Sequence, residues 1–265
     1  MKGEKPMAVA LTEQQKQSPL YKYYELPIDP VPEDVAKKIM TMTYDNEDGM
    51  AYEDINKMFD DGYLNCEFGL FGNPDGGCML ANLTDMPGVT PEMFDWWFAW
   101  HGLDTMRYII WDKDDHYYCQ TQNVEQALND KLSLRERFWD TEHEIKEALL
   151  DGQDPVPVRL HFVNPEVVGF DPEKLKEFKG TIICTPGPAI MIHFLRPTER
   201  GSELRTRFFM GYMATPNGVV RVPEFPRIDG MGRAMLMHNV KEFTHLAKIL
   251  PDVYNEFKDD WTVGL

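Results

Sequence analysis

Hydrophobic residues recur every three to four positions between residues 230 and 250, and this spacing predicts one long helix. One face of that helix carries an apolar stripe made of Leu236, Val240, Phe243, Ala247 and Leu250. Asp229 and Gly230 provide a start signal, and Pro251 is expected to end the regular run. We expect the remaining elements to pack around this helix.

The side of the helix roughly opposite the stripe mixes apolar and ionisable residues, while Lys241 falls in the narrow polar strip that remains. The members of this mixed side are Met231, Met235, His238, Glu242, His245 and Ile249. A helix that is apolar on two sides is expected to be buried, and a buried carboxylate needs a partner. His238 and Glu242, four residues apart, point the same way and could bind a metal ion. An ordinary ion pair at a surface edge is the alternative interpretation.

A second predicted helix is surrounded by aromatic side chains. Thr90 is suited to the N-cap, Pro91 to the first helical position, and Gly102 to the position after the end. Five aromatic residues lie between Phe94 and Trp100, so this helix is expected to be buried or to line a cavity. Residues 107–111 read as a strand, followed by a charged turn over residues 112–115.

Apolar and polar residues alternate with a period of two after about residue 158. Successive strands are predicted over residues 158–165, 180–186, 189–197, 203–214 and 218–225. Earlier in the chain, residues 68–71 and 78–83 could be the arms of a hairpin, and residues 121–150 form a helical zone with a second i, i+4 pair, His143 and Glu147. Antiparallel strands followed by a long helix predict an α+β fold with a curved sheet wrapped around the helix.

Composition and charge exclude several classes of protein. The chain has 265 residues, is 43% hydrophobic and carries a formal net charge of -17. This charge argues against binding nucleic acid or an anionic membrane through a broad basic surface. No run of about 18 apolar residues exists, and the N-terminus lacks the apolar core of a signal peptide, so we expect a cytoplasmic protein. The cysteines form no CxxC pair and are expected to be free thiols: Cys66, Cys78, Cys119 and Cys184.

Three segments in combination resemble the phloretin hydrolase and 2,4-diacetylphloroglucinol hydrolase family. They are PGVTPEMFDWWFAWHGL, followed by RY, IW and His116, then WDTEHEIKE, and finally HNVKEFTHLAKILP, which together span residues 87–251. The resemblance implies a Bet v 1-like, helix-grip catalytic domain over residues 91–265, preceded by a smaller, partly helical region over residues 1–90. It also implies a zinc enzyme that cleaves the carbon-carbon bond between an acyl group and a phloroglucinol ring.

The resemblance also implies a set of site residues. The zinc of this family is held by two histidines and two glutamates, which match His116, Glu147, His238 and Glu242 here. Two other histidines could replace His116 as the ligand from the earlier part of the chain. One is His143, which has the spacing of a helical pair with Glu147, and the other is His101. Tyr108 matches a pocket tyrosine of the family. The remaining expected site residues are His193 and Tyr212 as contacts to substrate hydroxyls, and Trp97, Trp100 and His143 as pocket walls.

The chemistry expected from this set is hydrolysis of a small aromatic ketone. Metal-activated water would attack the acyl carbonyl, while Tyr108, His193 or Tyr212 would hold the ring hydroxyls and relay protons. Two alternatives stay open: a carrier of hydrophobic ligands without chemistry, and a metal hydrolase of another ketone. Histidine and glutamate also accept iron, manganese or cobalt, so zinc follows from the resemblance rather than from the ligand types. A homodimer also stays open.

Overall fold

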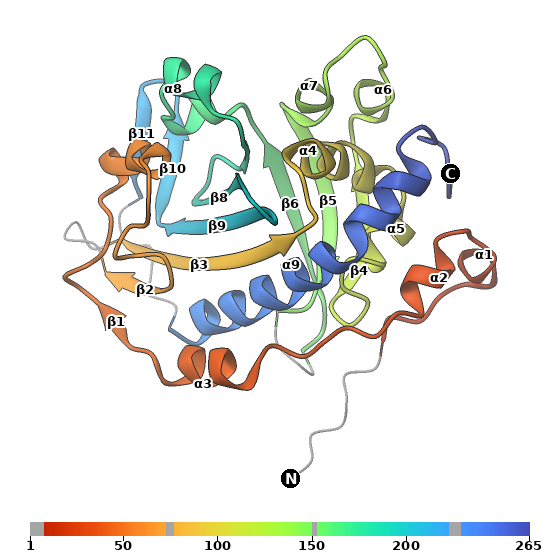
Figure 1. Ribbon diagram of the computed structural model, residues 1–265, viewed down its shortest axis with the longest axis horizontal. Coiled ribbons are helices and arrows are strands. Elements are labelled where there is room, and N and C mark those ends of the chain that lie inside the picture. The colour runs from red at the N-terminus through yellow and green to blue at the C-terminus, as the bar shows by residue number, and fades with distance from the viewer. Residues whose placement is uncertain (1–7, 73–76, 150–152, 223–228) are drawn as a thin grey trace.

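The computed structural model describes residues 8–72, 77–149, 153–222 and 229–265. Six strands form its largest sheet, in the spatial order β1-β2-β3-β9-β8-β7, and only the β1–β2 pair is parallel (Figure 1). These strands are β1 (Tyr44–Asp45), β2 (Gly69–Gly72), β3 (Cys78–Pro87), β7 (Thr181–Cys184), β8 (Ala189–Thr198) and β9 (Gly201–Met210). The predicted hairpin of residues 68–71 and 78–83 is confirmed as β2 and β3, although its turn lies outside the described residues.

A separate three-stranded antiparallel sheet contains β4 (His116–Thr121), β5 (Thr141–Glu147) and β6 (Val156–Phe162), in that order. β10 (Tyr212–Thr215) and β11 (Gly218–Arg221) form a small hairpin of their own. The structure thus has the mixed α+β architecture expected from the sequence, with mainly antiparallel sheets and a long helix near the C-terminus.

The described helices differ widely in length. The α-helices are α1 (Glu13–Lys16), α2 (Tyr21–Tyr24), α3 (Glu33–Thr41), α4 (Pro91–Trp100), α5 (Thr105–Ile109), α6 (Val124–Ala127), α7 (Leu134–Phe138), α8 (Pro172–Glu177) and α9 (Asp229–Phe257). The 3-10 helices are η1 (Tyr52–Phe59), η2 (His101–Leu103) and η3 (Pro165–Val168). None of the described helices is both long enough and apolar enough to cross a membrane.

The long helix α9 lies across β3 and also contacts α3 and α4 (Figure 1). It continues through Pro251 to Phe257, so the prediction that Pro251 ends the helix is wrong. The proline removes one backbone donor, but Val253 and Phe257 continue the buried face of the helix. Tertiary packing of that face outweighs the lost hydrogen bond.

The central sheet is covered on both faces because its strands alternate inward and outward residues. Leu80 and Phe208 pack in the cluster that contains residues of α3 and α9. Met79 and Phe209, one position along each strand, pack instead with residues of η1 and η3. This two-sided burial explains why β2, β7 and most of β9 lack exposed positions.

The aromatic helix α4 begins as predicted, since the Thr90 hydroxyl accepts a hydrogen bond from the Met93 amide at 3.2 Å. Residues 107–111, predicted as a strand, lie mainly in α5 instead. Asp104 caps that helix by accepting from the Met106 amide at 2.9 Å, a signal that the β-branched run RYIIW obscured.

The prediction of a helix around residue 143 is also wrong, because residues 141–147 form strand β5. Thr141, His143 and Ile145 are buried, while Glu142 and Lys146 are exposed, which is the burial pattern of a strand. His143 and Glu147 therefore do not stand one helical turn apart. They lie about 13 Å apart along one face of a strand.

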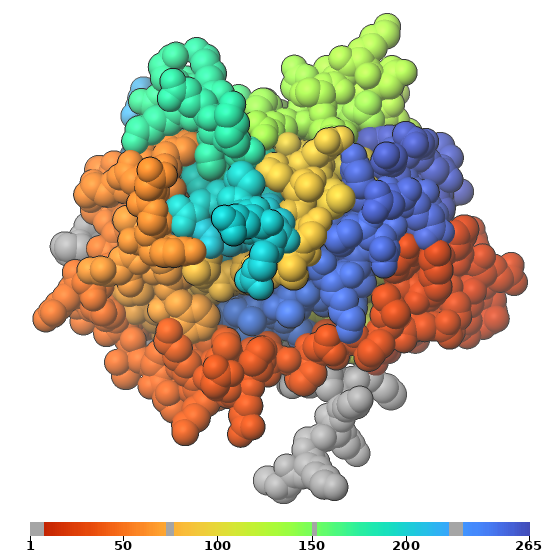
Figure 2. All heavy atoms as spheres, in the orientation of Figure 1, coloured from red at the N-terminus to blue at the C-terminus, as the bar shows by residue number. Residues whose placement is uncertain are grey.

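Residues before position 90 contribute to the central sheet as well as to its surroundings. β3 pairs along its whole length with β9, so the sheet contains strands from both sides of residue 90. Figure 2 shows the N-terminal residues along one edge of the molecule, beside α9. There the Tyr23 hydroxyl donates to Glu256 at 2.8 Å, and the Lys248 ammonium contacts Asp29 at 2.8 Å.

Candidate metal centre

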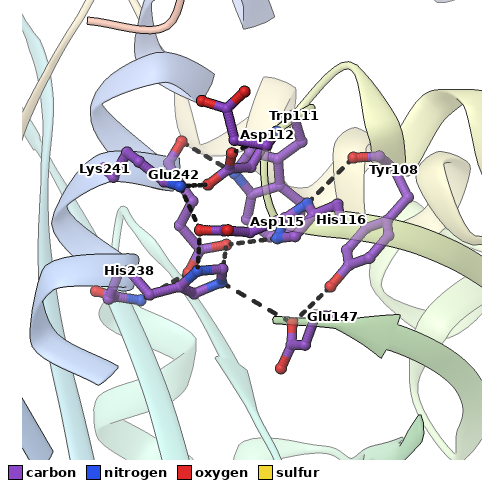
Figure 3. Close-up of polar contacts among 11 residues, drawn as sticks. Tyr108, Trp111, Asp112, Asp115, His116, Glu147, His238, Lys241 and Glu242 are labelled. Atoms are coloured by element: carbon purple, nitrogen blue, oxygen red, sulfur yellow. Dashed lines mark hydrogen bonds and ion pairs between the residues drawn. The ribbon is translucent and has the colours of Figure 1, made fainter. Parts of the chain in front are cut away.

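Four side chains from three elements converge at one end of the three-stranded sheet (Figure 3). His116 begins β4, and its cross-strand partner is Glu147 at the end of β5. His238 and Glu242 lie one turn apart on α9. The Nε2 atom of His116 lies 3.5 Å from Oε2 of Glu242. The Nε2 atom of His238 lies 3.9 Å from the Oε2 atoms of both Glu147 and Glu242.

Both imidazoles aim the same ring nitrogen at this group. His116 Nδ1 lies 3.1 Å from the carbonyl oxygen of Tyr108, and because a carbonyl only accepts, Nδ1 carries the proton and Nε2 keeps a lone pair. His238 Nδ1 similarly faces Oδ2 of Asp115 at 3.3 Å. Among the described residues, His116 Nε2 is a buried side-chain nitrogen without a hydrogen-bond partner. A buried lone pair without a donor fits a metal ligand.

The electrostatics of the group also favour a cation. Burial raises the pKa of Glu242 to about 8 although His238 acts in the opposite direction. Burial alone would lower the pKa of His238, but Glu242 and Asp115 outweigh it and raise that pKa to about 9. Glu242 and His238 therefore hold protons in this dry site that a divalent cation would displace.

Charged residues that contact His238 and one another hold its ring in place, and they were not predicted from the sequence. Lys241 contacts Oδ2 of Asp112 at 3.0 Å and also forms an ion pair with Asp115. Lys241 therefore lies in a buried network rather than on a polar strip. Asp115 directly precedes His116, so the charged turn that the sequence indicated was the available signal.

The geometry of three of the four donors fits a small divalent cation, and Glu147 faces His238 beside them. The facing atoms of His116, His238 and Glu242 all lie within 4.8 Å of one another. Donors around a tetrahedral zinc with bonds of about 2.0–2.2 Å would lie roughly 3.3–3.6 Å apart. The observed separations need only a small contraction, and the donor set of two imidazoles and two carboxylates balances a divalent charge.

A cavity of about 420 Å³ opens beside the four donors. Glu147, His238 and Glu242 line one part of it, and the remaining walls are mainly apolar. The apolar wall includes Phe98, Trp111, Ile145, Leu160, Met191 and Phe208. The cavity therefore joins a polar, cation-binding end to a space that would hold a flat hydrophobic ligand.

Tyr108 and His193 both line this cavity, as predicted for contacts to a substrate. The Tyr108 hydroxyl donates to Oε2 of Glu147 at 2.7 Å, and its ring stacks on His116 at a centroid distance of 3.8 Å. Burial raises the pKa of Tyr108 well above its usual value, so the phenol stays protonated. Burial lowers the pKa of His193 to about 3, so its imidazole is neutral.

Tyr212 does not lie at the cavity, contrary to the prediction. The predicted strand over residues 203–214 is interrupted at Gly211, whose φ is +80°, and the strand alternation that points Phe208 and Met210 inward is lost there. The Tyr212 ring instead stacks on Tyr52 at a centroid distance of 5.4 Å, within the cluster on the other face of the sheet.

Trp97 and Trp100 are buried but are not among the cavity-lining residues, so they do not form the expected pocket walls. Phe98 faces the cavity, and the two tryptophans lie about 100° and 200° around the helix from it. Trp100 stacks on Trp96 at a centroid distance of 4.6 Å, inside the aromatic core. Trp111, which the sequence reasoning did not single out, lines the cavity and donates from Nε1 to the Glu242 carbonyl at 3.0 Å.

His143 lines the cavity as predicted, and so does His101. Neither belongs to the group of close donors formed by His116, His238 and Glu242. The two histidines lie against each other instead, with ring centroids 5.4 Å apart. The structure thus gathers His116, Glu147, His238 and Glu242 at one place and separates both rival histidines from it.

Fold and site together define a mixed α+β protein in which buried histidines and glutamates lie at the polar end of an apolar cavity. Residues 50–255 match the family model described as the DAPG hydrolase PhiG domain. The chain belongs to this family, which confirms the resemblance found in the sequence.

Two curated relatives illustrate the similarity. The chain is 34% identical over 263 residues to phloretin hydrolase from Eubacterium ramulus, covering 95% of this chain and 94% of that protein. It is 26% identical over 265 residues to 2,4-diacetylphloroglucinol hydrolase from a Pseudomonas species, covering 91% and 89%. A solved protein from Nitrosomonas europaea covers 66% of this chain and 94% of its own chain at 11% identity, with a TM-score of 0.34, which carries no inference about fold.

Proposed function

We propose that the protein is a zinc-dependent hydrolase that cleaves the carbon-carbon bond between an acyl group and a phloroglucinol-type ring. The products are phloroglucinol and a carboxylic acid. The observation that carries this proposal is the convergence of two histidines and two glutamates on the polar end of an apolar cavity. Membership of a family whose relatives are named for such hydrolyses supports the substrate class.

His116, Glu147, His238 and Glu242 would hold the metal ion. A divalent zinc held there would supply Lewis acidity that polarises the acyl carbonyl and lowers the pKa of water to about 7. The chain itself orients these donors, because a hydrogen bond at Nδ1 fixes the tautomer of each histidine. His116, His238 and Glu242 therefore need little rearrangement to bind the ion, and Glu147 would complete the set from beside His238.

Tyr108 is the proposed proton donor. The reaction adds water to the acyl carbon and must place a proton on the ring carbon that leaves. The Tyr108 hydroxyl is protonated, lies in the cavity, and is hydrogen-bonded to Glu147, so a proton can pass between the two groups. Glu147 would thereby link the metal centre to proton transfer.

The apolar walls would orient the ring and exclude water. Phe98, Trp111 and Phe208 offer flat surfaces against which an aromatic ring can pack. The neutral imidazoles of His193 and His143 can hydrogen-bond ring hydroxyls. By accepting the proton of a ring hydroxyl, an imidazole would help the ring reach its keto tautomer, from which the carbon departs as an enolate.

We also propose that the central sheet and α9 form a Bet v 1-like helix-grip, which includes β2 and β3 and so begins before residue 91. The packing of α9 across β3, with the cavity between the helix and the sheets, supports this assignment. In such a fold the helix closes one side of a ligand cavity. This placement would explain why two of the proposed ligands come from α9.

The test measures metal content and turnover in the same preparations. Protein purified without added metal is expected to hold one equivalent of zinc and to release phloroglucinol from phloretin or an acylated phloroglucinol. His238→Ala should lose both the metal and the turnover. His245→Gln, at a buried histidine on the same helix outside the donor group, is the matched control and should keep both.

Two outcomes would contradict the proposal. Metal-free wild-type protein that binds phenolic ketones without converting them would identify a ligand carrier. A loaded enzyme that leaves acylphloroglucinols intact but hydrolyses another ketone would show that the substrate class is wrong.

A further inference from the structure

We propose that His101, Cys119 and His143 form a second metal site, for a borderline or soft ion such as zinc, in the wall of the same cavity. The three donors come from η2, β4 and β5. None of them belongs to the donor group around His238, and of the three only His143 has a part in the chemistry proposed above, as a contact to ring hydroxyls. The site therefore goes beyond the proposed function.

The donor atoms of this cluster lie as close together as those of the first group. One donor atom from each residue lies within 4.8 Å of the other two. Cys119 Sγ is 4.0 Å from Nδ1 of His143. All three residues are buried, at 2%, 0% and 3% exposure for His101, Cys119 and His143. A binding ion would draw the donors to roughly 3.3–3.6 Å, which the side-chain torsions of Cys119 and His143 can provide.

The backbone around the cluster leaves lone pairs available. His101 Nδ1 lies 2.9 Å from the Trp97 carbonyl, so Nδ1 carries the proton and the Nε2 lone pair is available to an ion. Burial lowers the pKa of His101 to about 4 and that of His143 well below its usual value, so both imidazoles are neutral at pH 7. Neutral imidazole is the form that binds metals.

Gly102 provides a second, independent observation, because the place of the His143 ring requires a residue without a side chain at position 102. A Cβ atom at residue 102 would lie 2.3 Å from Cε1 and 2.6 Å from Nδ1 of His143. Any residue other than glycine would push this ring away from its place beside His101. The absence of a side chain at residue 102 thus lets the His143 imidazole lie beside that of His101.

The thiol makes this site chemically different from the first. Burial raises the pKa of Cys119, so the free cluster holds a neutral thiol. On binding, the metal–sulfur bond forms, the S–H bond breaks, and the proton is released to solvent. A donor set of one thiolate and two imidazoles favours zinc, cobalt(II) or copper(I) over magnesium or calcium.

Occupancy of this site would change the cavity. His101 and His143 both line it, and the Tyr108 ring lies between the two centres, stacked on His116 at 3.8 Å and on His101 at 6.1 Å between centroids. A second ion would occupy space where the substrate ring must lie. If the proposed hydrolysis is correct, the first equivalent of zinc activates the enzyme and excess zinc inhibits it.

Cobalt(II) titration of the metal-free protein tests the site without substrate, so its result is independent of the proposed hydrolysis. A thiolate ligand gives an intense near-ultraviolet charge-transfer band, which the oxygen and nitrogen donors of the first centre cannot produce. We expect this band to grow with the second equivalent of cobalt and to vanish in Cys119→Ser. Cys184→Ser, at a buried cysteine outside both donor groups, is the matched control and should retain the band.

The variant also needs a check of folding. Cys119→Ser should still bind one equivalent of cobalt and keep the near-ultraviolet circular dichroism of the wild type. A wild-type titration that stops at one equivalent without a thiolate band would overturn the second site. A band that survives in Cys119→Ser would also overturn it. Inhibition by excess zinc that persists unchanged in Cys119→Ser would overturn the inhibitory role.

Discussion

At the scale of the residue, the hydrogen bond at Nδ1 of each proposed histidine ligand decides whether Nε2 has a lone pair to offer a metal ion. His116 is held by the Tyr108 carbonyl and His238 by Asp115, so both rings present Nε2 to the same point. Asp115 is in turn bound by Lys241. This support is local, since Asp115 precedes His116 and Lys241 follows His238 by one helical turn.

Asp115→Asn should weaken metal binding without removing a ligand. The amide cannot fix the His238 tautomer as a carboxylate does, and loss of such a partner typically costs about 10–100-fold in metal affinity. Competition with a chromophoric chelator measures the affinity. Asp85→Asn, at an exposed surface pair with Arg200, is the matched control. Equal metal affinities in the wild type, Asp115→Asn and Asp85→Asn would show that Asp115 has no positioning role.

Tyr108→Phe should separate proton transfer from metal binding. The substitution removes only the hydroxyl that donates to Glu147, so the variant should keep its metal. We expect kcat to fall by about 10²–10⁴-fold, the usual contribution of a positioned acid or base. Tyr23→Phe, which loses a hydroxyl that bonds Glu256 far from the cavity, should leave kcat unchanged. A Tyr108→Phe enzyme with normal kcat would exclude the phenol as proton donor.

The residue-level site could be predicted only in part from the sequence. His238 and Glu242 followed from one helix, because their burial and spacing are both visible in the local pattern. His116 and Glu147 were chosen through the family resemblance, since their cross-strand pairing depends on a register that no local pattern encodes. Tyr212 was misplaced because a single glycine changes which way a strand residue points.

At the scale of the element, segments with a clear period and strong end signals were predictable. α4 has a capping threonine and a proline at its start, and α9 has an uninterrupted apolar stripe. β5 was misread because a spacing of four is close to one helical turn and is also twice the strand period, so His143 and Glu147 share a face in either geometry. Burial of alternate residues, which resolves the ambiguity, is visible only in the fold.

The hairpin between β8 and β9 depends on a glycine with a positive φ. Gly201 has φ +143°, and a Cβ atom there would lie 2.4 Å from the Gly88 amide nitrogen. Gly218 has φ +104° with nothing within 4 Å of a Cβ position. Gly218→Ala should cost about 1–2 kcal/mol from backbone conformation alone. Gly201→Ala should cost about 3–4 kcal/mol, because the clash with backbone adds to the strain.

Urea denaturation of the two alanine variants measures this difference. The comparison controls for the loss of glycine at a positive φ, so the difference between the two variants reports the steric contact. Equal destabilisation would mean that the chain around Gly88 moves aside at little cost.

At the scale of the whole molecule, neutral histidines buried in the core make stability depend on pH. Burial lowers the pKa of His193 to about 3 and of His101 to about 4, from 6.5. Below pH 6.5 the unfolded chain binds protons that the folded chain excludes until pH 4 or lower. These histidines therefore lower the free energy of unfolding as the pH is lowered from 6.5 toward 4.

Each such histidine contributes a slope of about 1.4 kcal/mol per pH unit within that window. In His193→Phe the unfolded chain binds one proton fewer, so the slope of the unfolding free energy against pH should be lower by about this amount. Denaturant unfolding in the presence of a chelator, at several values of pH between 4 and 6.5, measures it. A slope that is unchanged in the variant would show that His193 is protonated in the folded protein.

The proposed ligands also differ in when they are made. A ribosome releases β4 and β5, with His116 and Glu147, well before α9. A nascent chain at that stage offers this centre only one imidazole and one carboxylate, too few donors to retain the ion there. Acquisition of the ion at this centre must then await the synthesis of α9, and a premature stop codon ahead of residue 238 would yield a polypeptide permanently unable to mature.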